Sequence, residues 1–349
     1  MDDLSWQRTA DDIWAGRIDG SGSEHARWHQ LVTPTAPQDG HTGDLALIGF
    51  ASDEGVRRNS GRPGAAEAPD ALRRALAPLA WHSRQPGSTP LSERTRPVRP
   101  HQREGASAGG AELPVIHDAG TLTVVGSDLE GAQRRLGDCT SSLLDRHGLV
   151  VVLGGGHETA YGSYLGRRAS QRCVGARVGV LNLDAHFDLR DHPVPTSGTP
   201  FLQMARDEQA AGRIFDYAVL GISATGNTPA LFAEAARWGV RYLRDVDCTP
   251  GRTAQVAAML ESWLAGCDLV HLSIDMDVLP ASTAPGVSAP AAYGVPMETA
   301  AAICGIVAAS GKLVLVDVVE VAPRFDPDGR TCRAAARLIA DLVAASPGR

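Results

Sequence analysis

The chain has 349 residues, 43% of them hydrophobic and 21% charged, a composition typical of a soluble globular protein. A formal net charge of -7 argues against general affinity for nucleic acid or anionic membranes. The six cysteines lie far apart and the acidic start lacks a long apolar run, so we expect reduced thiols in the cytoplasm and no secretory signal.

The first third of the chain changes character several times. Residues 1–43 are expected to form a polar N-terminal arm, and residues 44–349 a single catalytic domain. A strand is predicted over 44–50, then a Gly/Arg-rich loop over 51–69 and a helix over 70–80. Residues 82–112 are rich in Pro, Arg, Ser and Gly with almost no large apolar residues, which predicts an exposed low-complexity insertion.

From residue 113 onward, strands and helices alternate. We predict strands within 113–126, 148–156, 177–188, 216–223, 267–278 and 312–323, and helices over 129–147, 158–170, 253–266 and 297–311. Continuous Val/Leu/Ile strands separated by helices are typical of a parallel sheet that is covered on both faces. The sequence therefore predicts an α/β fold with three α/β/α layers and a mainly parallel sheet.

Three of these strands end in side chains that can bind metal. "GGGHE" supplies His157, "DAHFD" supplies Asp184, His186 and Asp188, and "SIDMDV" supplies Asp275 and Asp277. Alternate residues of a strand share a face, and ligands collect beyond the carboxyl ends of parallel strands. Carboxylates and imidazoles without thiolates suit Mn²⁺ better than structural zinc. Two cations about 3.5–4 Å apart would neutralise the four carboxylates and make a shared water nucleophilic at neutral pH.

Each motif alone has an ordinary structural explanation, such as a tight turn or a capped strand end. Together, in this order, the motifs resemble those of the ureohydrolase family, which includes arginase and agmatinase. The resemblance runs from about residue 45 to 340. It implies an arginase-like α/β/α fold, two Mn²⁺ ions held by the six residues above, a small-molecule amidine or guanidine substrate, and a homo-oligomer. It also implies that Asp184 or Asp188 bridges the ions.

The same resemblance gives two residues catalytic roles. Glu320, in "VVEVAP", lies where the family keeps a glutamate that faces the guanidinium or amidinium group. A carboxylate can accept two N–H bonds from such a planar cation, although a strand-end glutamate can also simply cap a loop. Asp277 is the residue implied to pass a proton to the departing amine.

Within the family, four segments resemble the formimidoylglutamase branch: residues 53–65, "GGGHE", 196–201 and 278–290. This branch hydrolyses N-formimidoyl-L-glutamate to L-glutamate and formamide in histidine degradation. The chain also departs from arginase. Phe201 stands where arginases carry a proton-shuttling histidine, and Arg190 stands where they carry an asparagine that binds the substrate carboxylate.

An arginine suits a substrate with two carboxylates, because its guanidinium binds a carboxylate through two hydrogen bonds. Arg190 is therefore the first candidate for substrate binding. The other candidates lie in the two matching loops: Arg57, Arg62, Asn59, Ser197 and Thr199. Three alternatives stay open: another ureohydrolase acting on a guanidino acid or agmatine, a single-zinc deacetylase of related fold, and a non-catalytic protein with a relict metal site.

Overall fold

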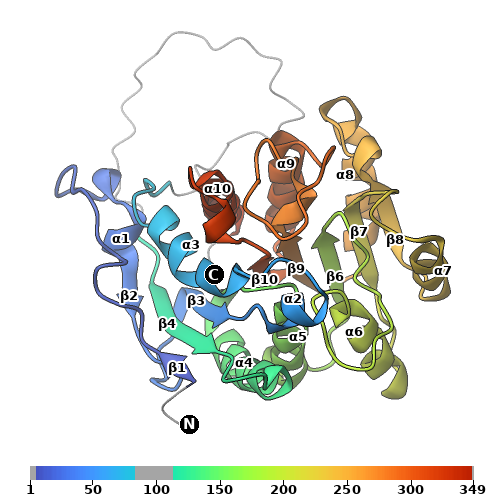
Figure 1. Ribbon diagram of the computed structural model, residues 1–349. Coiled ribbons are helices and arrows are strands. Elements are labelled where there is room, and N and C mark those ends of the chain that lie inside the picture. The colour runs from blue at the N-terminus through green and yellow to red at the C-terminus, as the bar shows by residue number, and fades with distance from the viewer. Residues whose placement is uncertain (1–4, 83–112, 348–349) are drawn as a thin grey trace.

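The apolar runs of the sequence form one large sheet (Figure 1). The computed structural model describes residues 5–82 and 113–347. The strand order is β1-β4-β3-β5-β10-β9-β6-β7-β8, β2 also pairs with β4, and every pairing except that of β1 with β4 is parallel. The strands are β1 Trp6–Gln7, β2 Val32–Pro34, β3 Gly43–Ala51, β4 Ile116–Thr123, β5 His147–Leu153, β6 Val178–Leu183, β7 Tyr217–Ile222, β8 Arg241–Arg244, β9 Leu269–Asp275 and β10 Leu313–Val319.

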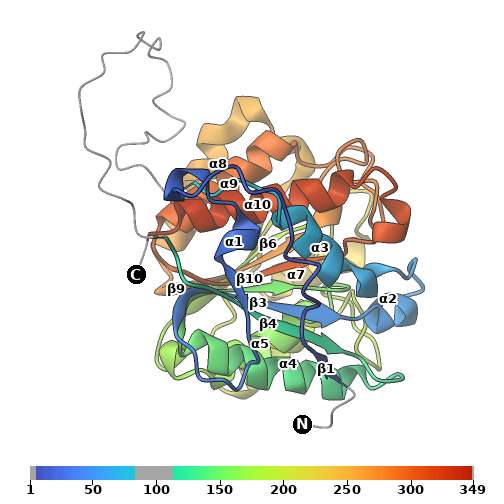
Figure 2. The same cartoon turned by 90° about the vertical axis from the view of Figure 1, so that its left-hand side faces the viewer.

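Helices cover both faces of this sheet. Helices α3, α8, α9 and α10 lie on one face, and α4, α5 and α6 lie on the other (Figure 1 and Figure 2). The predicted α/β fold with three layers and a mainly parallel sheet is confirmed. The helices are α1 Trp28–Leu31, α2 Glu54–Arg58, α3 Ala68–Leu76, α4 Leu129–Leu144, α5 Thr159–Ala169, α6 Pro200–Ala210, α7 Pro229–Arg237, α8 Thr253–Leu264, α9 Met297–Ala309 and α10 Arg330–Ala345.

Local sequence signals set several helix ends. The side chain of Asp128 caps α4 by accepting a hydrogen bond from the Gly131 amide at 2.9 Å. Proline occupies the first position of α6 and of α7. An N–H at this position has no hydrogen-bond partner within the helix, so its absence in proline costs nothing. The predicted helix 129–147 ends earlier, at Leu144, because His147 already begins β5. The predicted loop 51–69 contains the short helix α2.

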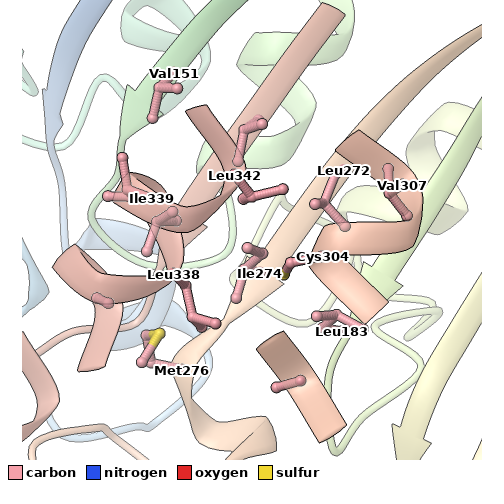
Figure 3. Close-up of a cluster of buried hydrophobic side chains, with 14 of the residues drawn as sticks. Val151, Leu183, Leu272, Ile274, Met276, Cys304, Val307, Leu338, Ile339 and Leu342 are labelled. Carbon is pink, nitrogen blue, oxygen red and sulfur yellow. The ribbon is translucent and has the colours of Figure 1, made fainter. Parts of the chain in front are cut away.

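The central strands bury side chains on both faces, which explains their continuous apolar sequence. Toward α9 and α10, Val151, Leu183, Leu272 and Ile274 pack against helix residues that include Leu338 (Figure 3). Neighbouring strand residues such as Val150 and Val152 point to the other face and pack with α4. Each buried aliphatic side chain contributes roughly 1.5–3 kcal/mol. The strand ends that carry the candidate ligands therefore project from a densely packed support.

The segment expected to be a polar arm lies along the edge of the sheet. It contributes β1 and β2, and it buries Ile13, Trp14 and Trp28. The Trp14 indole donates a 2.7 Å hydrogen bond to buried Asp118. Apart from His82, the insertion predicted at 82–112 lies outside the described residues. Within the described ranges, none of the helices is both long and apolar enough to cross a membrane.

Candidate metal centre

The predicted ligands lie at the carboxyl ends of three parallel strands, of which β6 and β9 are neighbours and β5 is separated from β9 by β10. His157 follows β5, Asp184 follows β6 directly, and Asp275 is the last residue of β9. The predicted strands 177–188 and 267–278 end earlier, at Leu183 and Asp275, so the prediction that strand alternation aligns the later ligands is wrong. Tight turns, not strand alternation, bring the later side chains of each motif back toward the sheet.

Hydrogen bonds from the backbone hold these turns. Asp184 Oδ1 accepts from the His186 amide at 2.6 Å, and Asp275 Oδ1 accepts from the Asp277 amide at 2.8 Å. Asp188 has a left-handed backbone with φ of 47°, a conformation that costs a non-glycine residue of order 1–3 kcal/mol. Such strain is typical of positions where a side chain must reach one particular place.

One cluster surrounds the imidazole of His157. Its Nδ1 lies 3.1 Å from Asp184 Oδ2, 3.0 Å from Asp188 Oδ2 and 3.1 Å from Asp275 Oδ2. All four side chains are buried, yet none of these carboxylates, nor any other residue of the described ranges, is aligned with Nδ1 for a hydrogen bond. A buried nitrogen faced by three carboxylate oxygens is the arrangement expected of metal ligands.

A second cluster shares Asp184 with the first. His186 Nδ1 lies 3.4 Å from Asp184 Oδ1 and 3.1 Å from Asp277 Oδ2. Asp184 thus presents one oxygen to each cluster and is placed to bridge two ions. The side chain of His186 is 23% exposed, so the second cluster is the one nearer to solvent.

Four carboxylates lie close together in this buried site, and their like charges oppose ionisation. Burial, together with the charges of Asp277 and Asp184, raises the pKa of Asp275 well above its usual range. Burial and the charge of Asp184 also raise the pKa of Asp188. Divalent cations would supply the missing positive charge. By donor chemistry, burial and the unpaired nitrogen, the residues fit a binuclear metal site.

Residues that the sequence analysis missed orient the ligands. His157 Nε2 lies 3.0 Å from Ser273 Oγ, which fixes the imidazole ring so that Nδ1 faces the carboxylates. Asn182 donates a 2.9 Å hydrogen bond to Asp184 Oδ2. The signal that could have revealed both is their polarity within strands that are otherwise apolar.

Glu320 joins the site from the end of β10. Its backbone is left-handed, with φ of 63°, and its amide donates to the Gly155 carbonyl at 2.8 Å. Its Oε1 accepts from the His157 amide at 2.9 Å. Burial, reinforced by the nearby charge of Glu158, raises the pKa of Glu320 to about 8. Among the described residues, no group donates to its other carboxylate oxygen.

The structure brings three of the proposed substrate-binding residues together. The side-chain amide of Asn59 donates to Ser197 Oγ at 3.2 Å. The backbone amide of Arg190 donates to the Gly198 carbonyl at 2.9 Å. A Cβ added at Gly198 would lie 2.8 Å from Arg190 Cδ and 3.4 Å from the Asn59 amide nitrogen. Arg190 is exposed, and its guanidinium makes no ion pair or hydrogen bond with any residue in the described part of the chain.

The other three candidates already have protein partners. The Arg62 guanidinium donates to the Val287 and Ser288 carbonyls and stacks 4.3 Å above the ring centroid of Phe325. Arg57 pairs with Asp53 at 2.8 Å, with more than half of its side chain still exposed. The Thr199 hydroxyl donates within its own turn and to Gln203. Their roles in substrate binding remain predictions.

Comparison with known proteins identifies the family. Residues 43–345 match the sequence model of the arginase family. The chain belongs to the arginase family. Among arginase-family relatives, it is 52% identical over 331 residues to the formimidoylglutamase of Nocardia farcinica, covering 95% of each chain. It is 51% identical over 332 residues to that of Rhodococcus jostii, covering 95% of this chain and 94% of the relative.

Solved structures of the arginase family show the same fold. The formiminoglutamase of Trypanosoma cruzi with Mn²⁺ superposes with a TM-score of 0.72 at 25% identity, covering 92% of this chain and 99% of the other. The formimidoylglutamase of Bacillus subtilis superposes with a TM-score of 0.72 at 22% identity, covering 95% of both chains. The resemblance drawn from the three motifs is confirmed. This arginase-family member is a hydrolase of C–N bonds in amidine or guanidino groups.

Proposed function

We propose that this chain is a dimanganese hydrolase that converts N-formimidoyl-L-glutamate and water to L-glutamate and formamide. The observation that carries this choice is the exposed guanidinium of Arg190, which pairs with none of the described residues. It lies two residues beyond the candidate ligand Asp188, beside Asn59 and Ser197. A cation at this place favours a substrate with more negative charge than arginine or agmatine has. The names of the curated relatives support the same substrate.

The metal ions would be held by the two clusters. His157, Asp184, Asp188 and Asp275 form the deeper set, and Asp184, His186 and Asp277 form the outer one. Oxygen-rich donors with imidazole and no thiolate suit manganese. When bound, a pair of such ions supplies a water made nucleophilic at neutral pH.

The remaining steps belong to side chains of the protein. Glu320 has one oxygen held by the His157 amide and the other available to accept an N–H of the amidine. This contact would orient the formimidoyl carbon toward the metal clusters. Asp277 would take up the proton that the attacking water gives up and pass it to the glutamate amine as the C–N bond breaks. Arg190 would hold a carboxylate of the substrate and thereby fix the position of the leaving group.

The direct test is hydrolysis of formimidoylglutamate, formylglutamate, arginine and agmatine by Mn²⁺-loaded protein, measured side by side. We expect formamide from formimidoylglutamate and negligible turnover of the other three. Release of urea from arginine or agmatine would keep the two-metal site and refute the assignment of Arg190. Asp184→Asn is the matched control, because it alters the residue shared by both clusters while keeping the side-chain shape.

Two broader expectations complete the proposal. All six cysteines are free and buried, which suits the reducing cytoplasm. The family resemblance leads us to propose a homo-oligomer, and sedimentation analysis of the purified protein would test it. We expect the small-molecule amidine to be the partner of the site, and we expect no nucleic-acid or membrane partner.

A further inference from the structure

A buried glutamate lies beside the metal centre and takes no part in the clusters described above. Glu158 follows His157 in the chain, and none of its surface is exposed. Its Oε1 accepts hydrogen bonds from the Ser52 hydroxyl at 2.6 Å and from the Gly55 amide at 3.0 Å. Ser52 lies between β3 and α2, and Gly55 is the second residue of α2. The Glu158 carboxylate therefore joins the metal-binding loop to the beginning of α2.

The backbones of these two segments are also closely packed. The Ser52 carbonyl accepts from the Gly156 amide at 2.9 Å. A Cβ at Gly55 would lie 2.5 Å from the Glu158 carboxylate, and one at Gly156 would lie 2.2 Å from it. Each distance is too short for any side chain. Glycine at these positions thus leaves the space that the carboxylate fills.

One turn of helix links this contact to the proposed substrate-binding residues. The Gly55 backbone amide donates to Glu158. The Gly55 carbonyl accepts from the backbone amide of Asn59 at 3.0 Å. Asn59 in turn reaches Ser197 through its side chain. Fixing the amino-terminal end of α2 therefore fixes Asn59 beside Arg190.

The metal ligand His157 is held by other contacts. Its amide donates to Glu320, and its imidazole is oriented by Ser273. Neither contact uses the side chain of Glu158. Removing that side chain should therefore disturb α2 more than it disturbs the metal clusters.

We propose that Glu158 is a positioning residue that sets α2 against the metal-binding loop and so determines selectivity for substrates bearing carboxylates. This inference rests on the proposed function, because it takes Asn59 and Arg190 to be the groups that recognise the carboxylates. Glu158 itself touches neither substrate nor metal.

The test compares Glu158→Ala with Glu158→Gln on two substrates. One is formimidoylglutamate, and the other is N-formimidoylpropylamine, which has the same reacting group and no carboxylate. Glutamine keeps an oxygen that can accept both hydrogen bonds, whereas alanine leaves two buried donors without a partner. Metal content is measured on every sample, which separates loss of positioning from loss of the metal centre.

For Glu158→Ala we expect KM for formimidoylglutamate to rise about tenfold, with kcat, metal content and turnover of the propylamine derivative nearly unchanged. Glu158→Gln should stay within about threefold of the wild type on both substrates. Ser52→Ala removes only one of the two bonds, so it should shift KM in the same direction by less, and it serves if the alanine variant at 158 does not fold.

Three results would overturn the inference: an equal loss on both substrates, a loss of metal, or a glutamine variant as impaired as the alanine one. Unchanged selectivity in both Glu158→Ala and Ser52→Ala would overturn it as well. A wild-type enzyme that does not prefer the dicarboxylate would instead refute the proposed function.

Discussion

Replacing Arg190 by methionine removes the exposed guanidinium while keeping a long unbranched side chain. The local backbone should survive, because it is held by the amide of residue 190 donating to the Gly198 carbonyl. No ion pair within the described residues is broken by the change. The expected effect is therefore confined to substrate binding.

The size of the effect follows from the lost contact. A hydrogen bond to a charged group contributes about 1.5–3 kcal/mol, and each 1.4 kcal/mol is a factor of ten. We expect kcat/KM for formimidoylglutamate to fall about 10- to 100-fold, mainly through KM. Lysine at the same position should recover part of the loss, because it keeps the charge but not the paired geometry.

The assay is steady-state release of formamide by Mn²⁺-loaded wild type, Arg190→Met, Arg190→Lys and Arg206→Met. Arg206 is a matched control: it is half exposed and pairs with Asp191 at 2.9 Å, outside the clusters. Arg190→Met activity within twofold of the wild type, or an equal loss in Arg206→Met, would refute the assignment of Arg190 as the carboxylate-binding residue.

Three further predictions concern the fold and the ligand supports. Arg73→Met leaves buried Asp118 without its guanidinium partner, so the free energy of unfolding in urea should fall by about 3–5 kcal/mol; a loss below 1 kcal/mol would contradict this. Burial lowers the pKa of His147 to about 4, so this side chain takes up a proton at a higher pH in the unfolded chain than in the folded one. The free energy of unfolding should therefore fall as pH drops from about 6.5 to 4, by at most about 3 kcal/mol. His147→Gln should lack this part of the pH dependence, and identical curves would refute it. Ser273→Ala frees the His157 ring and should weaken metal binding about 10- to 100-fold by chelator competition, whereas unchanged affinity would show that the hydroxyl does not orient the ligand.

Much of the fold and of the metal centre could be predicted from sequence because both depend on simple periodic patterns. Strands β5, β6, β9 and β10 are mainly apolar, and each ends in, or is followed within a few residues by, a candidate ligand or Glu320. Parallel strands carry their ends to one edge of the sheet, so residues far apart in the chain meet there. This geometry brings the three motifs together, whereas the turns after Leu183 and Asp275 set the final positions of the later side chains.

The remaining features of the fold and of the site depend on contacts that produce no pattern in the sequence. Strands β1 and β2 have two and three residues, too few for a periodic signal, and are held by their pairing with β4. The left-handed turn at Asp188 became visible only in the backbone angles. Arg62 and Arg190 are both candidate substrate-binding arginines, and only their surroundings distinguish them: carbonyl groups engage Arg62, whereas no described residue pairs with the Arg190 guanidinium.

The most direct test of the central claim is the manganese content of the protein after loading and dialysis, measured together with its release of formamide. Because Asp184 gives one oxygen to each cluster, we predict two ions per active wild-type chain and a marked loss of both ions and of activity in Asp184→Asn. An Asp184→Asn protein that keeps two ions and full turnover of formimidoylglutamate would contradict the two-metal account.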